Sequence, residues 1–252
     1  MPFLDFSGET IVMTHSDAEI DALLDMDLGM GDEDWTPTPH GRFLAQVLAE
    51  HNMVEGKSVL ELGGGVGNHS IILARQNPSH LVITEVTEGL LATTRENVER
   101  NVPGADFVEY RVADWLDLDG QFDVLVSNPP FARSGRQNRR YFIDELILNS
   151  HKRLTAGGEL VFIQSSMADI HRTRRDLKRN GFDSRIVDQA SGAFRDYYFE
   201  DKAFMAEIEL VPDGYERDEE DNYIETLFVI AATLMPWTPP DFAHIPTELR
   251  DS

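Results

Sequence analysis

The sequence predicts an α/β fold with a doubly wound, mainly parallel sheet. Short apolar segments of strand length alternate with amphipathic segments of helical length along most of the chain. The first apolar segment runs directly into a glycine cluster, Gly63 to Gly67, with glycine at four of its five positions. The length of 252 residues suits one such domain with short appendages. These observations indicate a sheet covered by helices on both faces, with a ligand site where the first strand ends.

The individual elements follow from the order of these segments. The first helix is expected to begin at Thr38, whose side chain can cap it, with Pro39 in its first turn, and to end near Gly56. The expected strands are Ser58–Leu62, Leu81–Thr84, Phe107–Val112, Phe122–Ser127 and Glu159–Gln164, and a further strand begins at Arg185–Val187. The expected helices between them are Asn68–Gln76, Glu88–Asn101, Arg139–Leu154 and Ala168–Asn180.

The two ends of the chain depart from this alternation. A weak amphipathic helix is expected near Ala18–Leu28, within an acidic segment. Phe204–Val211 and Tyr223–Thr233 flank an acidic turn and are predicted to form a long antiparallel hairpin. The predicted organisation is an acidic helical segment over residues 1–38, the main α/β domain over 39–212, and a C-terminal β-hairpin extension of that domain over 213–252.

Composition excludes several functional classes. The 45 acidic and 22 basic side chains give a formal net charge of −23, which argues against a surface that binds extended nucleic acid. Without cysteine there is no disulfide, thiolate nucleophile or thiolate zinc ligand. The histidines show no metal-ligand spacing and G-x-S-x-G is absent, so no metal site and no serine hydrolase is expected. No segment resembles a membrane span or a secretory leader, so a cytoplasmic protein without membrane contact is expected.

The glycine cluster is the first chemical signal. Glycines in a strand-to-helix turn permit backbone conformations and a close ligand approach that a Cβ atom would prevent. A tight turn alone would need only one of them. The NAD fingerprint G-x-G-x-x-G fails, because Asn68 stands where the third glycine is required after Gly63 and Gly65. The segment from Glu61 to Gly67 instead has the pattern E-x-G-x-G-x-G.

The second signal is Ser127-Asn128-Pro129-Pro130-Phe131, directly after the fourth strand. With the glycine pattern upstream, it resembles the motifs of class I S-adenosylmethionine-dependent methyltransferases of the N-P-P-[YF] type. That type includes the HemK/PrmC-like glutamine methyltransferases of the methyltransferase small domain group, and enzymes that act on exocyclic amines of adenine or guanine. The resemblance runs from Val59 to about Val161. It implies a Rossmann-like seven-stranded sheet with the strand order 3-2-1-4-5-7-6.

The resemblance also implies S-adenosylmethionine as the cofactor. Glu85, where the second strand ends, would accept hydrogen bonds from both ribose hydroxyls. Asp114 would contact the adenine amine, and Trp115 would line the base, although Trp115 could equally be a core residue. Glu61 would hold the amino group of the methionine part through its backbone or a water. The implied cofactor-binding residues are therefore Glu61, Gly63, Gly65, Gly67, Glu85, Asp114, Trp115 and Asn128. His40 lies where relatives place a loop over the cofactor, but a histidine at a helix start is more often structural.

The N-P-P-F residues suit a planar nitrogen acceptor. Such a nitrogen is a poor nucleophile, because its lone pair is delocalised. Asn128 and the carbonyl of Pro129 can accept its N–H bonds, and the prolines fix that geometry in advance. Phe131 offers an aromatic face for the planar group. Asn128, Pro129 and Phe131 are therefore the predicted catalytic residues, and positioning is expected to dominate the reaction, because its leaving group is a neutral thioether.

The substrate is less well defined by the sequence. The segment Arg133 to Arg179 carries 11 basic and five acidic side chains, so Arg133 and Arg136 are candidates to hold an anionic substrate group, with a solvated loop as the competing interpretation. Tyr197, in the aromatic segment Ala193–Phe199, could line the substrate site, although packing is favoured for that segment. The HemK/PrmC-like enzymes generally carry a helical domain before the catalytic part, whereas only about 38 residues precede the core here.

The prediction is an N-methyltransferase that acts on an amide or amino nitrogen of a small molecule or of a protein side chain such as glutamine. Methylation of an exocyclic amine in RNA or DNA fits the N-P-P-F motif but not the overall charge. The two motifs also leave open an enzyme that uses S-adenosylmethionine without transferring its methyl group, and a non-enzymatic binding module. The oligomeric state is not predicted.

Overall fold

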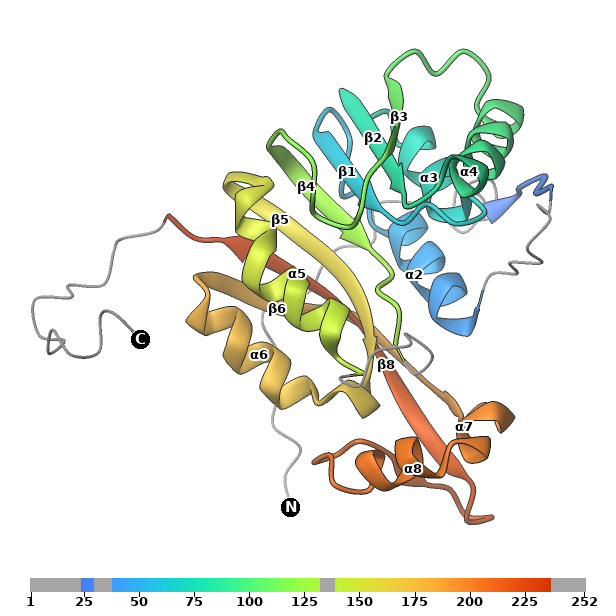
Figure 1. Cartoon of the computed structure of the whole chain (residues 1–252), viewed down its shortest axis with the longest axis vertical. Helices are drawn as coiled ribbons and strands as arrows, with labels where there is room; N and C mark the ends of the chain where they lie inside the picture. Colours follow the sequence, from blue (N-terminus) through green and yellow to red (C-terminus); the bar gives the residue numbers. More distant parts are fainter. Residues whose placement is uncertain (1–23, 30–37, 132–138, 237–252) are drawn as a thin grey trace, which may run out of the picture.

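A computed structural model of the chain describes residues 24–29, 38–131 and 139–236. The strands are β1 (Ser58–Leu62), β2 (His80–Glu85), β3 (Val108–Val112), β4 (Phe122–Ser127), β5 (Leu154–Ser165), β6 (Phe182–Ala193), β7 (Glu216–Arg217) and β8 (Tyr223–Leu234). The α-helices are α2 (Pro39–Glu50), α3 (Asn68–Arg75), α4 (Glu88–Asn101), α5 (Tyr141–Asn149), α6 (Ile170–Arg179), α7 (Asp196–Glu200) and α8 (Lys202–Ile208). Figure 1 shows them around one twisted sheet, which confirms the predicted α/β class.

The main path of the sheet has the order β3-β2-β1-β4-β5-β8-β6, and β7 pairs with β8 beside this path. The pairs among β1 to β5 are parallel, whereas β8 is antiparallel to both β5 and β6. With β8 as the seventh strand, this is the predicted order 3-2-1-4-5-7-6. The order reverses between β1 and β4, and a sheet of this kind binds its ligands at such a switch point.

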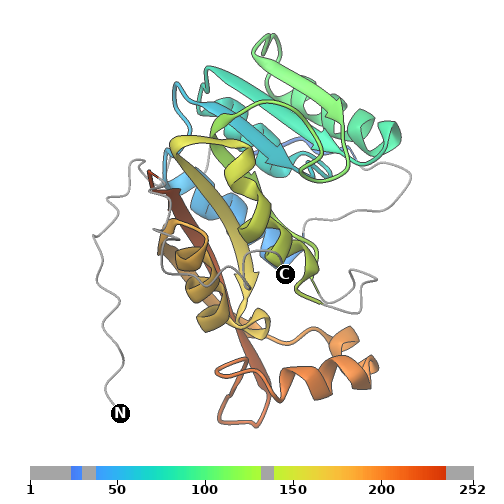
Figure 2. The ribbon, with the colours of Figure 1, turned by 60° about the vertical axis from the view of Figure 1, so that its left-hand side comes forward.

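The strands are apolar because both faces of the sheet are covered. Val59, Val124 and Val161 point to one face and join an apolar cluster with residues of α2 and α3. Leu60 and Leu125 point to the other face, where residues of α5 and α6 complete a second cluster. Two buried faces require nearly continuous hydrophobic segments, which the sequence shows. Figure 2 shows α7 and α8 apart from these covering helices, at one end of the long β6–β8 ribbon.

The predicted hairpin of Phe204–Val211 with Tyr223–Thr233 is wrong. Tyr223–Thr233 does lie in a strand, β8, but β8 pairs with β5 and β6 inside the sheet. Phe204 lies in helix α8, whose first backbone N–H groups bond to the side chain of Asp201. Phe204 and Ile208, four residues apart, are both buried, whereas Leu210 is 84% exposed. Helical spacing and an N-cap therefore prevail over the apparent alternation. Across the acidic turn, only the two residues of β7 pair with β8.

Smaller differences concern the element ends and the termini. The predicted helix Arg139–Leu154 is shorter, because α5 ends at Asn149 and a 3₁₀ turn leads into β5. The predicted N-terminal helix Ala18–Leu28 lies mostly outside the described residues. The described residues of that segment, 24–29, lie against α4, where the backbone N–H of Gly29 donates to the side chain of Asn97. No helix in the described part of the chain is both long and apolar enough to span a membrane.

Candidate active site

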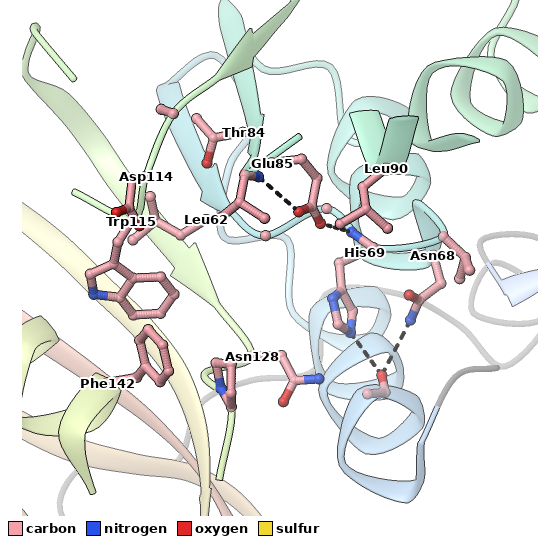
Figure 3. A pocket seen from close by; sticks show the side chains of 18 of the residues that line it. Leu62, Asn68, His69, Thr84, Glu85, Leu90, Asp114, Trp115, Asn128 and Phe142 are labelled. Carbon is pink, nitrogen blue, oxygen red and sulfur yellow. Dashed lines mark hydrogen bonds between the residues drawn. The ribbon is translucent and has the colours of Figure 1, made fainter. Parts of the chain in front are cut away.

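A cavity of about 440 Å³ opens where β1, β2 and β4 end (Figure 3). It lies at the reversal of strand order, as the fold predicts. Side chains from both sides of the sheet and the backbone of the glycine turn enclose it. Its lining residues are Thr38, Gly41, Leu62, Gly63, Gly64, Gly65, Val66, Asn68, His69, Thr84, Glu85, Val86, Leu90, Ala113, Asp114, Trp115, Asn128, Pro130 and Phe142.

Gly63, Gly64 and Gly65 of the glycine turn border this cavity, whereas the described lining does not include Gly67. Gly63, Gly65 and Gly67 have φ angles of 77°, 58° and 88°, a conformation that side chains disfavour. Gly64 has a different requirement, since a Cβ atom there would lie 2.8 Å from both Ile83 and Thr94. The hydroxyl of Thr94 in α4 donates to the carbonyl of Gly65 at 2.7 Å. The turn is therefore pressed between β2 and α4, and its open side is bare backbone.

Glu85 at the end of β2 is buried at the edge of the cavity. One of its carboxylate oxygens accepts from the N–H of Gly65 at 2.6 Å, and the other accepts from the N–H of Val86 at 3.1 Å. A carboxylate offers about four acceptor positions, so about two stay available to a ligand. Figure 3 shows this side chain beside the glycine turn, facing the same space. Two neighbouring hydroxyl groups of a ligand could donate hydrogen bonds to these carboxylate oxygens.

Asp114 and Trp115 lie in the turn after β3 and both line the cavity. Trp115 has a φ of 53°, and its ring packs edge-on against Phe142 of α5, with centroids 4.9 Å apart. The sequence left open whether Trp115 lines the site or belongs to the core. In the structure it lines the cavity and also packs against the core. Phe142 is a site residue that the sequence did not indicate. The edge-on pair of rings and the Asp114 carboxylate form an aromatic wall with an acceptor beside it, which suits a flat base with an amino group.

The N-P-P-F turn divides between the cavity and the interior. Asn128 and Pro130 line the cavity, and Pro129 is buried. The described lining does not include Phe131, whose ring instead packs edge-on against Phe204, with centroids 6.1 Å apart. Tyr197 also lies outside that lining, where it accepts a hydrogen bond from Arg195. Arg133 and Arg136 lie outside the described residues.

Helices α2 and α3 supply a wall that the sequence did not predict. Thr38 caps α2 as expected, accepting from the N–H of Gly41 at 3.2 Å, and both residues line the cavity. The carbonyl of Gly41 accepts hydrogen bonds from Nε2 of His69 at 2.8 Å and from Nδ2 of Asn68 at 3.4 Å. A polar Asn-His pair in the first turn of a buried helix was the available signal. The wall is thus fixed by side chains of α3 that bind backbone of α2.

Glu61 lies behind this wall rather than in the cavity lining. Its side chain is 1% exposed, and one carboxyl oxygen accepts from the hydroxyl of Ser70 at 2.5 Å. The other oxygen lies 3.8 Å from Nδ1 of His69. Because Nε2 of His69 donates to a carbonyl, Nδ1 is the bare nitrogen. Burial raises the pKa of Glu61 to about 8 and lowers the pKa of His69 to about 4. Both groups are therefore neutral near pH 7.

We expect Glu61→Gln to change how the free energy of unfolding depends on pH. Between its ordinary pKa of 4.5 and the raised value of about 8, Glu61 is protonated in the folded chain and ionised in the unfolded chain. The folded state then binds more protons, so this group makes stability fall as pH rises through that window. Glutamine cannot ionise, so the variant's stability should fall less steeply between about pH 5 and 8.

Urea unfolding at several pH values measures this slope in both proteins. The neutral His69 has the opposite effect between pH values of about 4 and 6.5, but it is present in both chains and cancels in the difference. Parallel stability curves for the two proteins would contradict a protonated Glu61.

The cavity offers a ligand its shape, open backbone and hydrogen-bond acceptors. No three His, Asp or Glu side chains in residues 24–29, 38–131 and 139–236 are grouped to hold a metal ion. Asn128 projects toward the cavity near the aromatic wall, the Glu85 acceptors and the open glycine backbone. Such an arrangement orients two molecules relative to each other, which is the main requirement of a group transfer.

Comparison with known proteins agrees with this geometry. The family model described as the methyltransferase small domain matches residues 39–192. A protein of Methanocaldococcus jannaschii, named as a candidate protein N5-glutamine methyltransferase, is 28% identical over 148 residues, covering 53% of this chain and 74% of that protein. The ribosomal RNA small subunit methyltransferase C of Pectobacterium atrosepticum is 29% identical over 129 residues, covering 51% of this chain and 35% of that one. The match thus spans about three quarters of one relative and about a third of the other.

A solved structure shows the same fold. The crystal structure of a candidate RNA methyltransferase from Pyrococcus horikoshii aligns with a TM-score of 0.58, covering 88% of this chain and all of that one, at 15% identity. The fold and the family resemblance expected from the two motifs are therefore both confirmed.

Proposed function

The chain belongs to the methyltransferase small domain family, and from this premise we propose that it transfers a methyl group from S-adenosylmethionine to a planar amide or amino nitrogen. The observation that carries the proposal is the cavity itself, which brings Glu85, Asp114 and the glycine turn together with Asn128. A cofactor site and an acceptor-orienting amide thus share one space.

The residues present fit the cofactor. At Gly63 and Gly65 an added Cβ would meet no described atom within 4 Å, so the backbone there borders open space for a ligand. Glu85 would accept from the ribose hydroxyls through its remaining acceptor positions. Asp114 would accept from the adenine amine, between Trp115 and the glycine turn. When bound, the cofactor supplies an electrophilic methyl group on a sulfonium centre.

The acceptor nitrogen would be oriented by the N-P-P-F turn. The Asn128 side-chain oxygen and the Pro129 carbonyl accept its N–H bonds and so hold the nitrogen in one orientation. Phe131 packs on Phe204, so the acceptor could stack on Phe131 only if it reached the ring from the side away from Phe204. Phe131, Tyr197, Arg133 and Arg136 are the candidate acceptor contacts.

The charge beside this turn favours a small molecule or a protein side chain over RNA. Residues 195–222, which carry α7, α8 and β7, contain 11 acidic and three basic side chains and pack on Phe131. Such a surface repels a phosphate backbone. A glutamine-like side chain fits the N-P-P-F chemistry, and the M. jannaschii relative bears a name of that kind.

RNA is the second candidate, because another relative is named a ribosomal RNA methyltransferase. The basic residues Arg174, Arg175 and Lys178 line a hollow beside the start of β6. Helix α6 runs back across the sheet from the end of β5 to the start of β6. The hollow therefore lies at one edge of the sheet, whereas the end of β4 and Asn128 lie at the opposite edge. An RNA acceptor would therefore have to avoid the acidic residues beside the site.

A labelled-methyl transfer assay tests the proposal. Labelled S-adenosylmethionine is incubated with the protein and, in parallel, with a metabolite pool, a protein lysate and total RNA. We expect label in the protein or metabolite fraction, and none with Glu85→Ala as the matched control. Label confined to RNA would favour the second candidate. Binding of the cofactor product without any transfer would contradict the methyltransferase assignment and point to a binding module or another use of the cofactor.

A further inference from the structure

A series of partly buried polar contacts joins the cavity wall to residues 194–222, which we call the insert. We name the contact between His40, Arg195 and Glu225 the His40 link. Nδ1 of His40 accepts a hydrogen bond from the guanidinium of Arg195, and Nε2 of His40 lies 3.5 Å from a carboxylate oxygen of Glu225. His40 begins α2, Arg195 precedes α7, and Glu225 lies in β8, so three elements meet at one imidazole ring.

The protonation state of this ring follows from its partners. A guanidinium only donates, so Nδ1 of His40 must be bare, and Nε2 then carries the proton toward Glu225. Burial, and then the charge of Arg195, lower the pKa of His40 to about 3. Burial raises the pKa of Glu225, which is 4% exposed. A neutral imidazole thus lies between a cation and an acid, and the hydrogen bond from Arg195 fixes its orientation.

On the cavity side, the next residue is Gly41. Its carbonyl is bound by His69 and Asn68, and a Cβ atom added to it would lie 3.4 Å from Nδ2 of Asn128. The start of α2 is therefore held by α3 on one side and by Arg195 on the other. It borders both the cavity and the residue proposed to orient the acceptor.

On the other side, Arg195 is anchored in the aromatic part of the insert. Its Nη1 donates to the hydroxyl of Tyr197 at 2.9 Å, and its guanidinium carbon lies 5.7 and 5.8 Å from the ring centroids of Tyr197 and Tyr198. Tyr198 is 2% exposed and belongs to the apolar cluster that includes Phe204 and contacts Phe131. The described lining of the cavity does not include Arg195. Its direct contact with the cavity wall is therefore through His40.

We propose that Arg195 is a positioning residue for the transfer site. Through His40 it holds the start of α2 against the cavity and Asn128, so the placement of the insert influences how tightly the cavity binds its cofactor. This inference rests on the proposed function, because it takes the cavity to be the cofactor site. It assigns a role to residues beyond the two sequence motifs.

Calorimetry with S-adenosylhomocysteine tests this role. We expect Arg195→Met to raise the dissociation constant about tenfold, which corresponds to about one net hydrogen bond of preorganisation. Amide hydrogen exchange at residues 41–44 should be faster in the same variant. The matched control is Arg217→Met, which removes another guanidinium of the insert, 3.7 Å from the Tyr223 ring centroid and without contact to α2 in the structure. Its affinity should stay within about twofold of the wild type.

Two substitutions at His40 separate positioning from general stability. Glutamine can accept from Arg195 and present an N–H toward Glu225, as the neutral imidazole does, whereas alanine can do neither. We therefore expect His40→Gln to keep the affinity within about threefold and His40→Ala to lose about tenfold. If Arg195→Met does not fold, this pair gives the answer alone.

Wild-type affinity in Arg195→Met and His40→Ala, with unchanged exchange at residues 41–44, would overturn the inference. Equal losses in His40→Gln and His40→Ala would also overturn it, since packing alone would then be responsible. A wild-type protein that does not bind S-adenosylhomocysteine would overturn the proposed function instead, and the exchange measurement would still report on the His40 link.

Discussion

Replacing Asn128 by alanine is expected to slow methyl transfer by about 100- to 1,000-fold, while the affinity for S-adenosylhomocysteine stays within about threefold. The side chain lines the cavity from the end of β4, on the side opposite to Glu85 across the glycine turn. Its removal takes away an oxygen proposed to orient the acceptor nitrogen and leaves Glu85, Asp114 and the glycine turn, which are proposed to hold most of the cofactor. The loss should therefore appear in kcat rather than in cofactor binding.

Single-turnover transfer and calorimetry, made on the same preparations, measure the two quantities. Asn128→Asp keeps an acceptor oxygen and should lose less activity than the alanine variant. Asn149→Ala is the control: this side-chain amide, at the end of α5, donates to Glu145 and lies outside the cavity lining. The variant should transfer the methyl group at the wild-type rate. Normal turnover in Asn128→Ala would sink the proposed acceptor role.

Glu85→Ala is expected to weaken S-adenosylhomocysteine binding by at least about 100-fold. Hydrogen bonds to a charged acceptor contribute about 1.5–3 kcal/mol each, and two ribose hydroxyls would lose theirs. The substitution also removes the acceptor of the Gly65 N–H, 2.6 Å away, so the glycine turn loses a contact that fixes its shape. Glu85→Gln keeps one acceptor oxygen without the charge, and we expect it to fall between alanine and the wild type.

Calorimetric titration gives these affinities directly. Glu109→Ala is the matched control, because Glu109 is a partly exposed acid on the neighbouring strand β3 that pairs with Arg111 and lies outside the cavity lining. Its affinity should equal that of the wild type. Unaltered binding in Glu85→Ala would remove the assignment of this cavity to the cofactor.

The parts of the fold that local patterns determine were predictable. Strands buried on both faces read as continuous apolar segments, which located β1, β2, β4 and the centre of β5. Glycines, strand-end acids and the N-P-P-F turn each occur at the carboxyl end of a strand, and a parallel sheet brings such ends together. That is why Glu85, Asp114, Trp115 and Asn128 were predicted to share one site, and all four line the cavity.

The parts that depend on packing between distant segments were not predictable. Thr38 and Gly41 reach the cavity only because His69 and Asn68 bind the α2 backbone, a contact between residues 27 and 28 positions apart. Phe142 reaches the site from α5, which covers the face of the sheet opposite to α2 and α3. The strand expected at Phe204–Val211 is a helix because its apolar residues pack on Phe131 and Tyr198, partners that no local pattern reveals. Glu61 matched the motif, yet Ser70 and His69 bury it behind the wall.

The two ends of the insert meet. The backbone N–H of Phe194 donates to the carbonyl of Tyr223 at 2.9 Å, directly beyond the last paired residues of β6 and β8. The chain therefore leaves and re-enters the seven-stranded path of the sheet at one point, and the pairing of β6 with β8 does not include what lies between. Lengthening or shortening a surface loop costs little closure entropy. Residues 196–222, beyond Arg195, are thus the place where insertions, deletions or a transplanted segment can change which acceptor this core takes, while the seven-stranded sheet stays the same.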